Sequence, residues 1–150
     1  MATVSFDREA EMGRIDVTLT VTNTIDQARA EAGDIVAASV RSVTLDGVLV
    51  DTGATFLSLS ADVIAGLGLR PVRDVMIGTA TGPQRARLYG DARLALLGRE
   101  GTFDCLELPG ATQPLLGVIP MEALGLEPDL AGRRLRLLPD QSPDSYITAL

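Results

Sequence analysis

The most regular pattern in the chain is an alternation of apolar and polar residues near its start. Ile15, Val17, Leu19 and Val21 alternate with one aspartate and three threonines. A period of two is typical of a strand that has one face in a core and the other in water. The pattern therefore predicts a first strand over 15–21.

Short runs rich in Val and Leu, separated by glycine and proline, follow along the rest of the chain and predict further strands. They cover about 37–45, 48–50, 56–59, 72–77, 86–89, 92–97, 102–108 and 134–138. Glycine-containing segments at 78–83 and 98–101 are expected to be the tips of two hairpins. Asp46-Gly47 suits a tight turn between two strands, because type I′ geometry requires positive φ at both central residues.

Helical signals are few. Ser60 is a suitable N-cap for a helix over 61–67, with Asp62 in the first turn and Gly68 beyond the end. A second short helix is expected over 121–124, and the Ala-, Glu- and Arg-rich segment 25–34 is either a helix or a surface loop. The predicted fold class is all-β with one or two short helices.

The composition predicts what kind of core the chain can form. A chain of 150 residues, of which 46% are hydrophobic and only 3% aromatic, has room for one domain with an aliphatic core. We expect this domain to cover 13–139, between a weakly specified N-terminal extension over 1–12 and a polar tail over 140–150. Cys105 lies in a predicted strand and is expected to be a small core residue.

The charge and the cysteine content limit the partners and the compartment. The formal charge is −7, and no cluster of basic residues is present. We therefore expect no nucleic-acid partner and no membrane partner, because both surfaces require neutralisation of phosphate. A single cysteine, no apolar run of about 20 residues and no signal-peptide pattern lead us to expect a cytoplasmic protein.

The absence of histidine narrows the possible chemistry. With no histidine in the sequence, catalysis by Ser-His or Cys-His pairs and His-ligated zinc are excluded. An enzyme of this composition has to use carboxylates, arginines, hydroxyl groups or one thiol. We expect neither a metal nor a cofactor.

One short motif stands out as a candidate for chemistry. The apolar run 48–50 ends at Asp51-Thr52-Gly53-Ala54-Thr55, which places a carboxylate where a strand opens into a turn that glycine permits. A simple strand-ending turn is one interpretation of Asp-Thr-Gly. Haloacid-dehalogenase-like phosphatases require a second aspartate where Gly53 stands. The Asp-x-Gly-x-Thr phosphate loop of actin- and hexokinase-like ATPases does match, but their two-lobed cleft requires a much longer chain.

A faint internal repeat adds context to this motif. An apolar strand, a glycine, a short helix and Gly-Leu occur first from Leu49 to Leu69 and again from Leu115 to Leu126. Only the first copy carries an acid, and the second has Leu115-Leu116-Gly117 at the corresponding place.

With these motifs in this order, the chain from about Gly13 to Pro139 resembles the retropepsin-like aspartic proteases, in particular small single-domain prokaryotic members. The resemblance implies a closed barrel that is half of a pepsin-type bilobal enzyme. It also implies a homodimer in which two Asp51 carboxylates share one proton, activate water and hydrolyse extended, apolar peptide segments. The flap of the family corresponds to the segment around Gly78–Gly82.

The resemblance also implies roles for the neighbouring residues. Thr52 would hydrogen-bond across the dimer, and Gly53 would belong to the catalytic loop. Contacts with the peptide substrate would come from both sides of the site, namely from Ala54, Thr55, Thr79, Ala80, Thr81 and Gly82.

Two departures distinguish the chain from viral relatives. The acid and the arginine that pair in those proteins are replaced by Thr55 and Val118. Ala54 removes a hydroxyl donor from beside the carboxylate, from which we predict activity at weakly acidic pH. The alternative function is a catalytically silent, dimeric peptide-binding module of the same fold.

Overall fold

The structure is a computed structural model and describes residues 13–110 and 113–139. The predicted extension 1–12 and tail 140–150 lie outside the described residues. Most of the described chain is β-strand: β1 Asp16–Asn23, β2 Ser42–Val50, β3 Leu57–Ser60, β4 Arg70–Thr79, β5 Gly82–Leu96, β6 Arg99–Leu108, β7 Leu115–Leu116, β8 Leu126–Asp129 and β9 Arg134–Leu137.

The helices are short and lie between strands. They are α2 Thr24–Glu31, α3 Ala61–Leu67 and α4 Val118–Ala123, with a 3₁₀ turn η1 at Ala37–Ser39. The mostly β class is confirmed, although the described part holds three short α-helices where one or two were predicted, because 24–31 is helical. No helix in the described ranges is long and apolar enough to cross a membrane.

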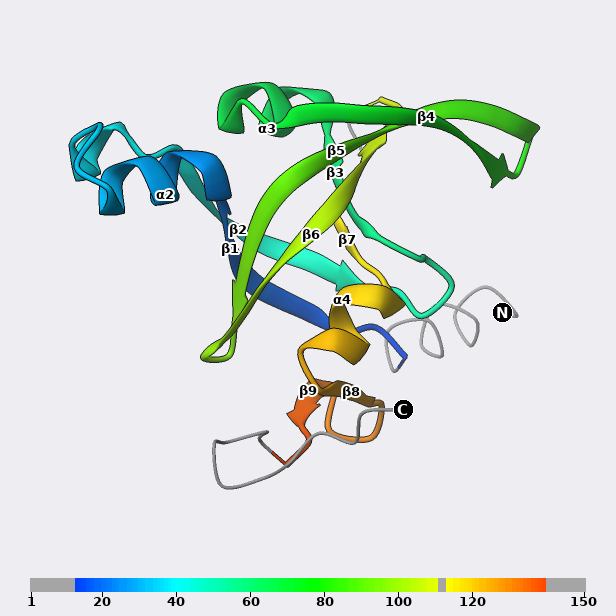
Figure 1. The fold of residues 1–150 in the computed structure, drawn as a ribbon. Helices are drawn as coiled ribbons and strands as arrows, with labels where there is room; N and C mark the ends of the chain where they lie inside the picture. Colours follow the sequence, from blue (N-terminus) through cyan, green and yellow to red (C-terminus); the bar gives the residue numbers. More distant parts are fainter. Residues whose placement is uncertain (1–12, 111–112, 140–150) are drawn as a thin grey trace, which may run out of the picture.

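Seven strands form one sheet in the order β1-β2-β7-β3-β6-β5-β4, and β1 also pairs with β5. The β2–β7 and β3–β6 pairs are parallel, and the other pairs of this sheet are antiparallel. Strands β8 and β9 form a separate antiparallel pair next to α4 (Figure 1). The short strand β7 therefore lies between β2 and β3, which are not paired with each other.

The predicted hairpin turn at Asp46-Gly47 is wrong. Both residues lie inside β2, which pairs with β1 on either side of them through Leu19↔Leu45 and Val17↔Val48. The register shifts at this point, and Gly47 has φ +64. Positive φ at a glycine is equally suited to a bulge, and pairing with β1 decides between a bulge and a turn. The predicted strand start is also wrong, since 37–39 form η1.

Strand β5 is longer than the sequence pattern indicates. The predicted strands 86–89 and 92–97 are parts of this single strand, which bends at Asp91, where φ is +69 and the register with β6 shifts. Its first half pairs with β4, and the resulting hairpin projects from the rest of the sheet (Figure 1). The turn at its tip contains Ala80 and Thr81.

The core is aliphatic, as the composition predicts. Its members come from both parallel pairs and from the helices: Leu19, Val21, Val48, Leu57, Leu59, Ile64, Leu67, Leu69, Ala92, Leu94, Leu96, Cys105, Leu116, Met121, Leu124, Leu126 and Leu135. Burial raises the pKa of the Cys105 thiol to about 12. Cys105 is thus a core residue, as predicted, and its thiolate form is strongly disfavoured.

Two of the predicted helix signals are confirmed in α3. Ser60 caps the helix, with its hydroxyl accepting a hydrogen bond from the Val63 amide at 3.4 Å. Gly68 ends it in the left-handed region at φ +62. The helix therefore covers the predicted residues, because capping and termination depend on neighbours in the sequence.

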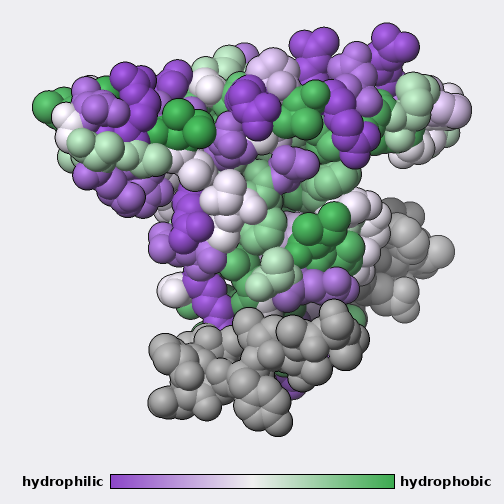
Figure 2. Space-filling view, viewed as in Figure 1, coloured by the Kyte–Doolittle hydropathy of each residue, from purple (hydrophilic) through white to green (hydrophobic). Residues whose placement is uncertain are grey.

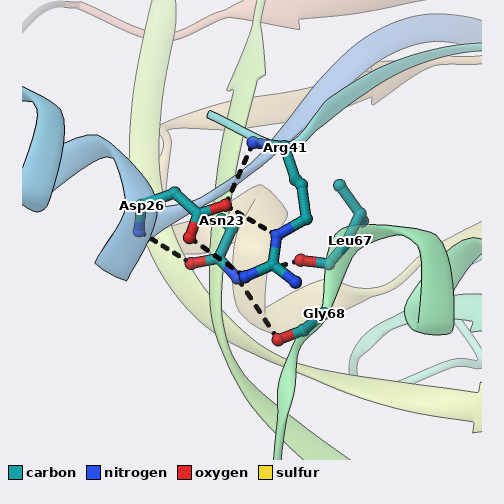
Figure 3. A network of polar contacts seen from close by, with 5 residues as sticks. All are labelled: Asn23, Asp26, Arg41, Leu67 and Gly68. Carbon is teal, nitrogen blue, oxygen red and sulfur yellow. Dashed lines mark hydrogen bonds and ion pairs between the residues drawn. The ribbon is translucent and has the colours of Figure 1, made fainter. Parts of the chain in front are cut away.

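A partly buried polar network joins α2 to the end of α3 (Figure 3). Asn23 caps α2 by accepting from the Asp26 amide at 3.0 Å, and its side-chain nitrogen donates to the Leu67 carbonyl at 2.9 Å. The Arg41 guanidinium donates to both carboxylate oxygens of Asp26, at 2.8 and 3.0 Å. Hydrogen bonds from Arg41 lower the pKa of Asp26 from 3.8 to about 2.

Candidate active site

Asp51 is the first residue after β2, at the point where the chain leaves the sheet. Residues 51–56 form the loop between β2 and β3, and we call this segment the aspartate loop. Strand β7 is parallel to β2, with Leu49↔Leu115 and Val50↔Leu116 as partners. The two copies of the faint sequence repeat are therefore neighbours in the sheet, and Gly117 follows β7 as Asp51 follows β2.

The aspartate loop crosses directly over Gly117. The Asp51 amide donates to the Leu116 carbonyl at 3.0 Å, and the Val118 and Ile119 amides donate to the carbonyls of Ala54 and Thr55 at 2.9 and 3.0 Å. A Cβ atom at Gly117 would lie 2.5 Å from the Phe56 carbonyl oxygen. Only glycine allows the two segments to approach this closely.

The Asp51 carboxylate is oriented by its own loop. The Gly53 amide donates to Asp51 Oδ1 at 2.9 Å, and the Ala54 amide donates to the Asp51 carbonyl at 3.1 Å. The side chain is half-exposed, and its carboxylate forms no ion pair with any arginine in the described part of the chain. Asp51 is thus held in place while one of its oxygens stays available.

A groove of about 1140 Å³ separates the aspartate loop from β4. Figure 2 shows the molecule hollowed beneath the β4–β5 hairpin, with hydrophobic side chains exposed in the recess. The groove is lined by Asp51, Gly53, Ala54, Thr55, Phe56, Ser58, Arg73, Asp74, Val75, Met76, Ile77, Gly78, Thr79, Leu106, Leu108, Pro109, Gln113 and Leu115. A space of this volume can hold an extended chain of several residues.

The structure brings most of the predicted site residues to this groove. Among the predicted residues, those that line it are Asp51, Gly53, Ala54, Thr55 and Thr79. Thr52 is exposed outside it, and Ala80, Thr81 and Gly82 form the hairpin tip beyond the lining residues. Their roles in a dimer and in a flap stay predictions.

Sequence reasoning missed the wall opposite Asp51. Residues 73–78 line the groove, and so do Phe56, Leu106 and Gln113. The apolar residues over 72–77 correctly predict a strand. Nothing in that pattern tells which strand faces Asp51, because this depends on the path of the whole sheet.

The walls of the groove are apolar with a few charges. Phe56, Val75 and Ile77 are half-buried and pack against Leu106 and its neighbours. The carboxylate of Asp74 lies 3.0 Å from Nε of Arg87 and is therefore neutralised. The site can hold an extended apolar chain beside one carboxylate that has no cationic partner among the described residues.

Comparison with known proteins adds no function to this geometry. Neither protein-family models nor curated protein sequences match the chain. Within residues 13–110 and 113–139, no group of three or more His, Cys, Asp or Glu side chains is placed to hold a metal ion. The aspartate loop and the groove are therefore the features of this chain that indicate a function.

Proposed function

We propose that the protein is an aspartic endopeptidase of the retropepsin-like type, active as a homodimer. The observation that carries this proposal is the aspartate loop. It crosses Gly117 beside β7 and holds a half-exposed Asp51 carboxylate at the side of an apolar groove. The chain contributes one such carboxylate, so a second copy has to supply the other.

In the proposed dimer the two Asp51 carboxyl groups lie close together and share one proton, because like charges at short distance do not both ionise. The ionised carboxylate takes a proton from a water molecule, which attacks the carbonyl carbon of the peptide bond. The protonated carboxyl polarises the carbonyl oxygen, and the proton taken from water goes to the leaving amine. The Gly53 amide orients Asp51 for the first step.

Two features of the sheet support the proposed fold. Strand β1 pairs with β2 and also with β5, so the ladder of pairings from β1 through β2, β7, β3, β6 and β5 returns to β1. This arrangement supports the closed barrel that the resemblance implies. The projecting β4–β5 hairpin supports a flap, in which Thr79, Ala80, Thr81 and Gly82 would cover the bound peptide.

The groove supports a peptide substrate with apolar side chains. Its half-buried walls fit such side chains, and its shape suits an extended backbone. Thr52 is exposed, so its hydroxyl is free to reach a second subunit in the proposed dimer. We propose a cytoplasmic location, with which a single, buried Cys105 is compatible.

The decisive test is replacement of Asp51. In a mixed peptide library at weakly acidic pH, we expect Asp51→Asn to reduce cleavage by roughly 10²- to 10⁴-fold, because the variant lacks the general base. Asp104→Asn, an equally conservative change at an exposed position of β6, should cleave like the wild type. Cleavage sites and rates that are equal for wild type and Asp51→Asn would disprove the proposal.

The groove also supports a second candidate, a catalytically silent module that binds extended peptides. This alternative is favoured by the size and apolar walls of the groove, which need no chemistry to be useful. It predicts peptides that bind and are recovered uncut from the wild-type protein. Mass spectrometry of the bound peptides distinguishes the two functions.

A further inference from the structure

The groove is bordered by the edge of a strand and not by its face. All residues from Arg73 to Thr79 line it without interruption. Side chains of a strand point alternately to two faces, so an unbroken run of lining residues places the strand edge at the groove. In the described part of the sheet β4 pairs with β5 alone, and its other edge is therefore available to pair with an added strand.

The two faces of β4 differ in character. Val75 and Ile77 are half-buried and pack against the cluster that contains Leu106. Asp74 and Met76 point to the opposite, exposed face, where Asp74 is paired with Arg87. Pairing with β5 is regular from residue 73 to 79, so Arg73 lies on the same face as Val75 and Ile77.

Arg73 is the unusual member of this face. It is exposed, it lines the groove, and its guanidinium takes part in none of the ion pairs of the described residues. An arginine stays charged at any pH at which the protein is folded and binds carboxylates through two parallel N–H donors. The groove therefore combines two apolar positions with one free positive charge, spaced two residues apart along a strand.

We propose that the groove selects extended peptides in which two apolar residues and one acidic residue occur at every second position. In a strand added to the edge of β4, side chains opposite Ile77 and Val75 would be apolar, and the next side chain on that face would be a Glu or Asp opposite Arg73. An antiparallel peptide would carry this pattern in the order apolar-x-apolar-x-acid, and a parallel peptide in the order acid-x-apolar-x-apolar. Selective cleavage of such peptides rests on the proposed function, whereas their selective binding does not.

Binding is tested with the Asp51→Asn variant, which leaves peptides intact in the proposed mechanism. Peptides of this pattern with Glu at the acidic position should bind roughly 3- to 10-fold more tightly than the same peptides with Gln, and added salt should reduce the difference. A second substitution, Arg73→Gln, should remove the difference. Arg73→Lys should keep part of it, and Arg73→Glu should favour a basic residue at that position.

Arg85→Gln is the matched control. Arg85 is exposed on the same hairpin, where it is the β5 partner of Met76. It is not among the residues that line the groove, and its loss changes the net charge equally. The preference for Glu over Gln should survive in this variant. An equal loss in Arg73→Gln and Arg85→Gln would assign the effect to overall charge and overturn the proposal.

Cleavage profiles separate this inference from the proposed function. If wild type cuts peptides and only Arg73→Gln loses the acidic preference, both are supported. If the profiles of wild type and Arg73→Gln are identical, the inference fails and the protease stands. If nothing is cut but the Asp51→Asn protein binds Glu peptides through Arg73, the protease fails and the inference stands. Absence of both cleavage and selective binding overturns both.

Discussion

At the scale of single residues, two aspartates show that the surroundings of a carboxylate determine its role. Asp26 is buried, accepts three hydrogen bonds from Arg41 and has a pKa of about 2. Asp51 is half-exposed and accepts one hydrogen bond, from the Gly53 amide. The first carboxylate is committed to the fold, whereas the second is oriented and left open to the groove.

The Asp26–Arg41 pair should make stability depend on pH. Because the pKa of Asp26 is lowered from 3.8 to about 2, its contribution is complete above the ordinary value and is lost as pH falls toward the lowered one. Near neutral pH we expect Asp26→Asn to reduce the free energy of unfolding by about 1–3 kcal/mol, since Arg41 loses its charged partner. Urea unfolding over a pH series should show the gap narrowing in acid.

Asp104→Asn again serves as the comparison, because Asp104 is exposed on β6. Its unfolding curve should stay close to that of wild type at each pH. A gap between wild type and Asp26→Asn that is constant from neutral to strongly acidic pH would contradict the role of the ionised Asp26.

At the scale of elements, the site depends on two segments that are distant in the sequence. Strand β7 pairs with both β2 and β3, and the aspartate loop closes over the glycine that follows β7. The Val118 and Ile119 amides at the start of α4 then hold the loop through its carbonyl groups. The position of Asp51 is therefore set by β7 and α4 as much as by β2.

Gly117→Ala should disturb this crossing. The new Cβ would lie 2.5 Å from the Phe56 carbonyl oxygen and 2.7 Å from the Phe56 amide nitrogen, and both are backbone atoms. We expect a loss of about 1–3 kcal/mol in stability, measured by urea unfolding, together with reduced peptide cleavage. Gly66→Ala in α3 is the control, because no atom lies within 4 Å of its Cβ and alanine favours helices by about 0.5–1 kcal/mol. Gly117→Ala should therefore lower the free energy of unfolding, and Gly66→Ala should raise it. Equal changes in both variants would contradict the close approach at Gly117.

At the scale of the whole molecule, one chain supplies a single Asp51 carboxylate to the groove. Its surface also carries exposed leucines near α4. Leu130, Leu137 and Leu138 are 60%, 48% and 40% exposed, and they lie on or beside the β8–β9 hairpin. Leu135 of the same hairpin is buried in the core. These exposed leucines lie near α4, whose first two amides bind the aspartate loop, and they suit the dimer contact that the proposed chemistry requires.

Activity per subunit should therefore depend on protein concentration. Dilution through the dissociation constant of the dimer should lower the specific rate of peptide cleavage, because a monomer has only one Asp51. Leu137→Asp should raise the protein concentration at which half of the specific activity is lost by roughly 10-fold or more. Val36→Asp changes an even more exposed apolar residue, in the loop before η1, and should leave this concentration unchanged. Sedimentation gives the assembly state, and a monomer that cleaves at the full rate would refute the shared site.

The sequence alone predicted the features that depend on near neighbours. The alternation over 15–21, the cap at Ser60 and the end at Gly68 led to β1 and α3, because strand periodicity and helix capping are local. The repeat that contains Asp51 and Leu115-Leu116-Gly117 was also visible in the sequence, although its pairing through β2 and β7 was not. In contrast, Asp46-Gly47 was misread as a turn, since a glycine with positive φ suits a bulge equally well.

What the sequence determined by itself is the mostly β class, the aliphatic core that includes Cys105, and the identity of Asp51 as the candidate acid. Only the tertiary structure decided that β7 lies between β2 and β3, that β5 is one bent strand, and that Arg73 faces the groove. The physical reason is the range of the interactions. Strand periodicity and helix caps depend on residues that are close in the sequence. Strand order and the walls of a groove depend on backbone pairing between segments far apart in the chain.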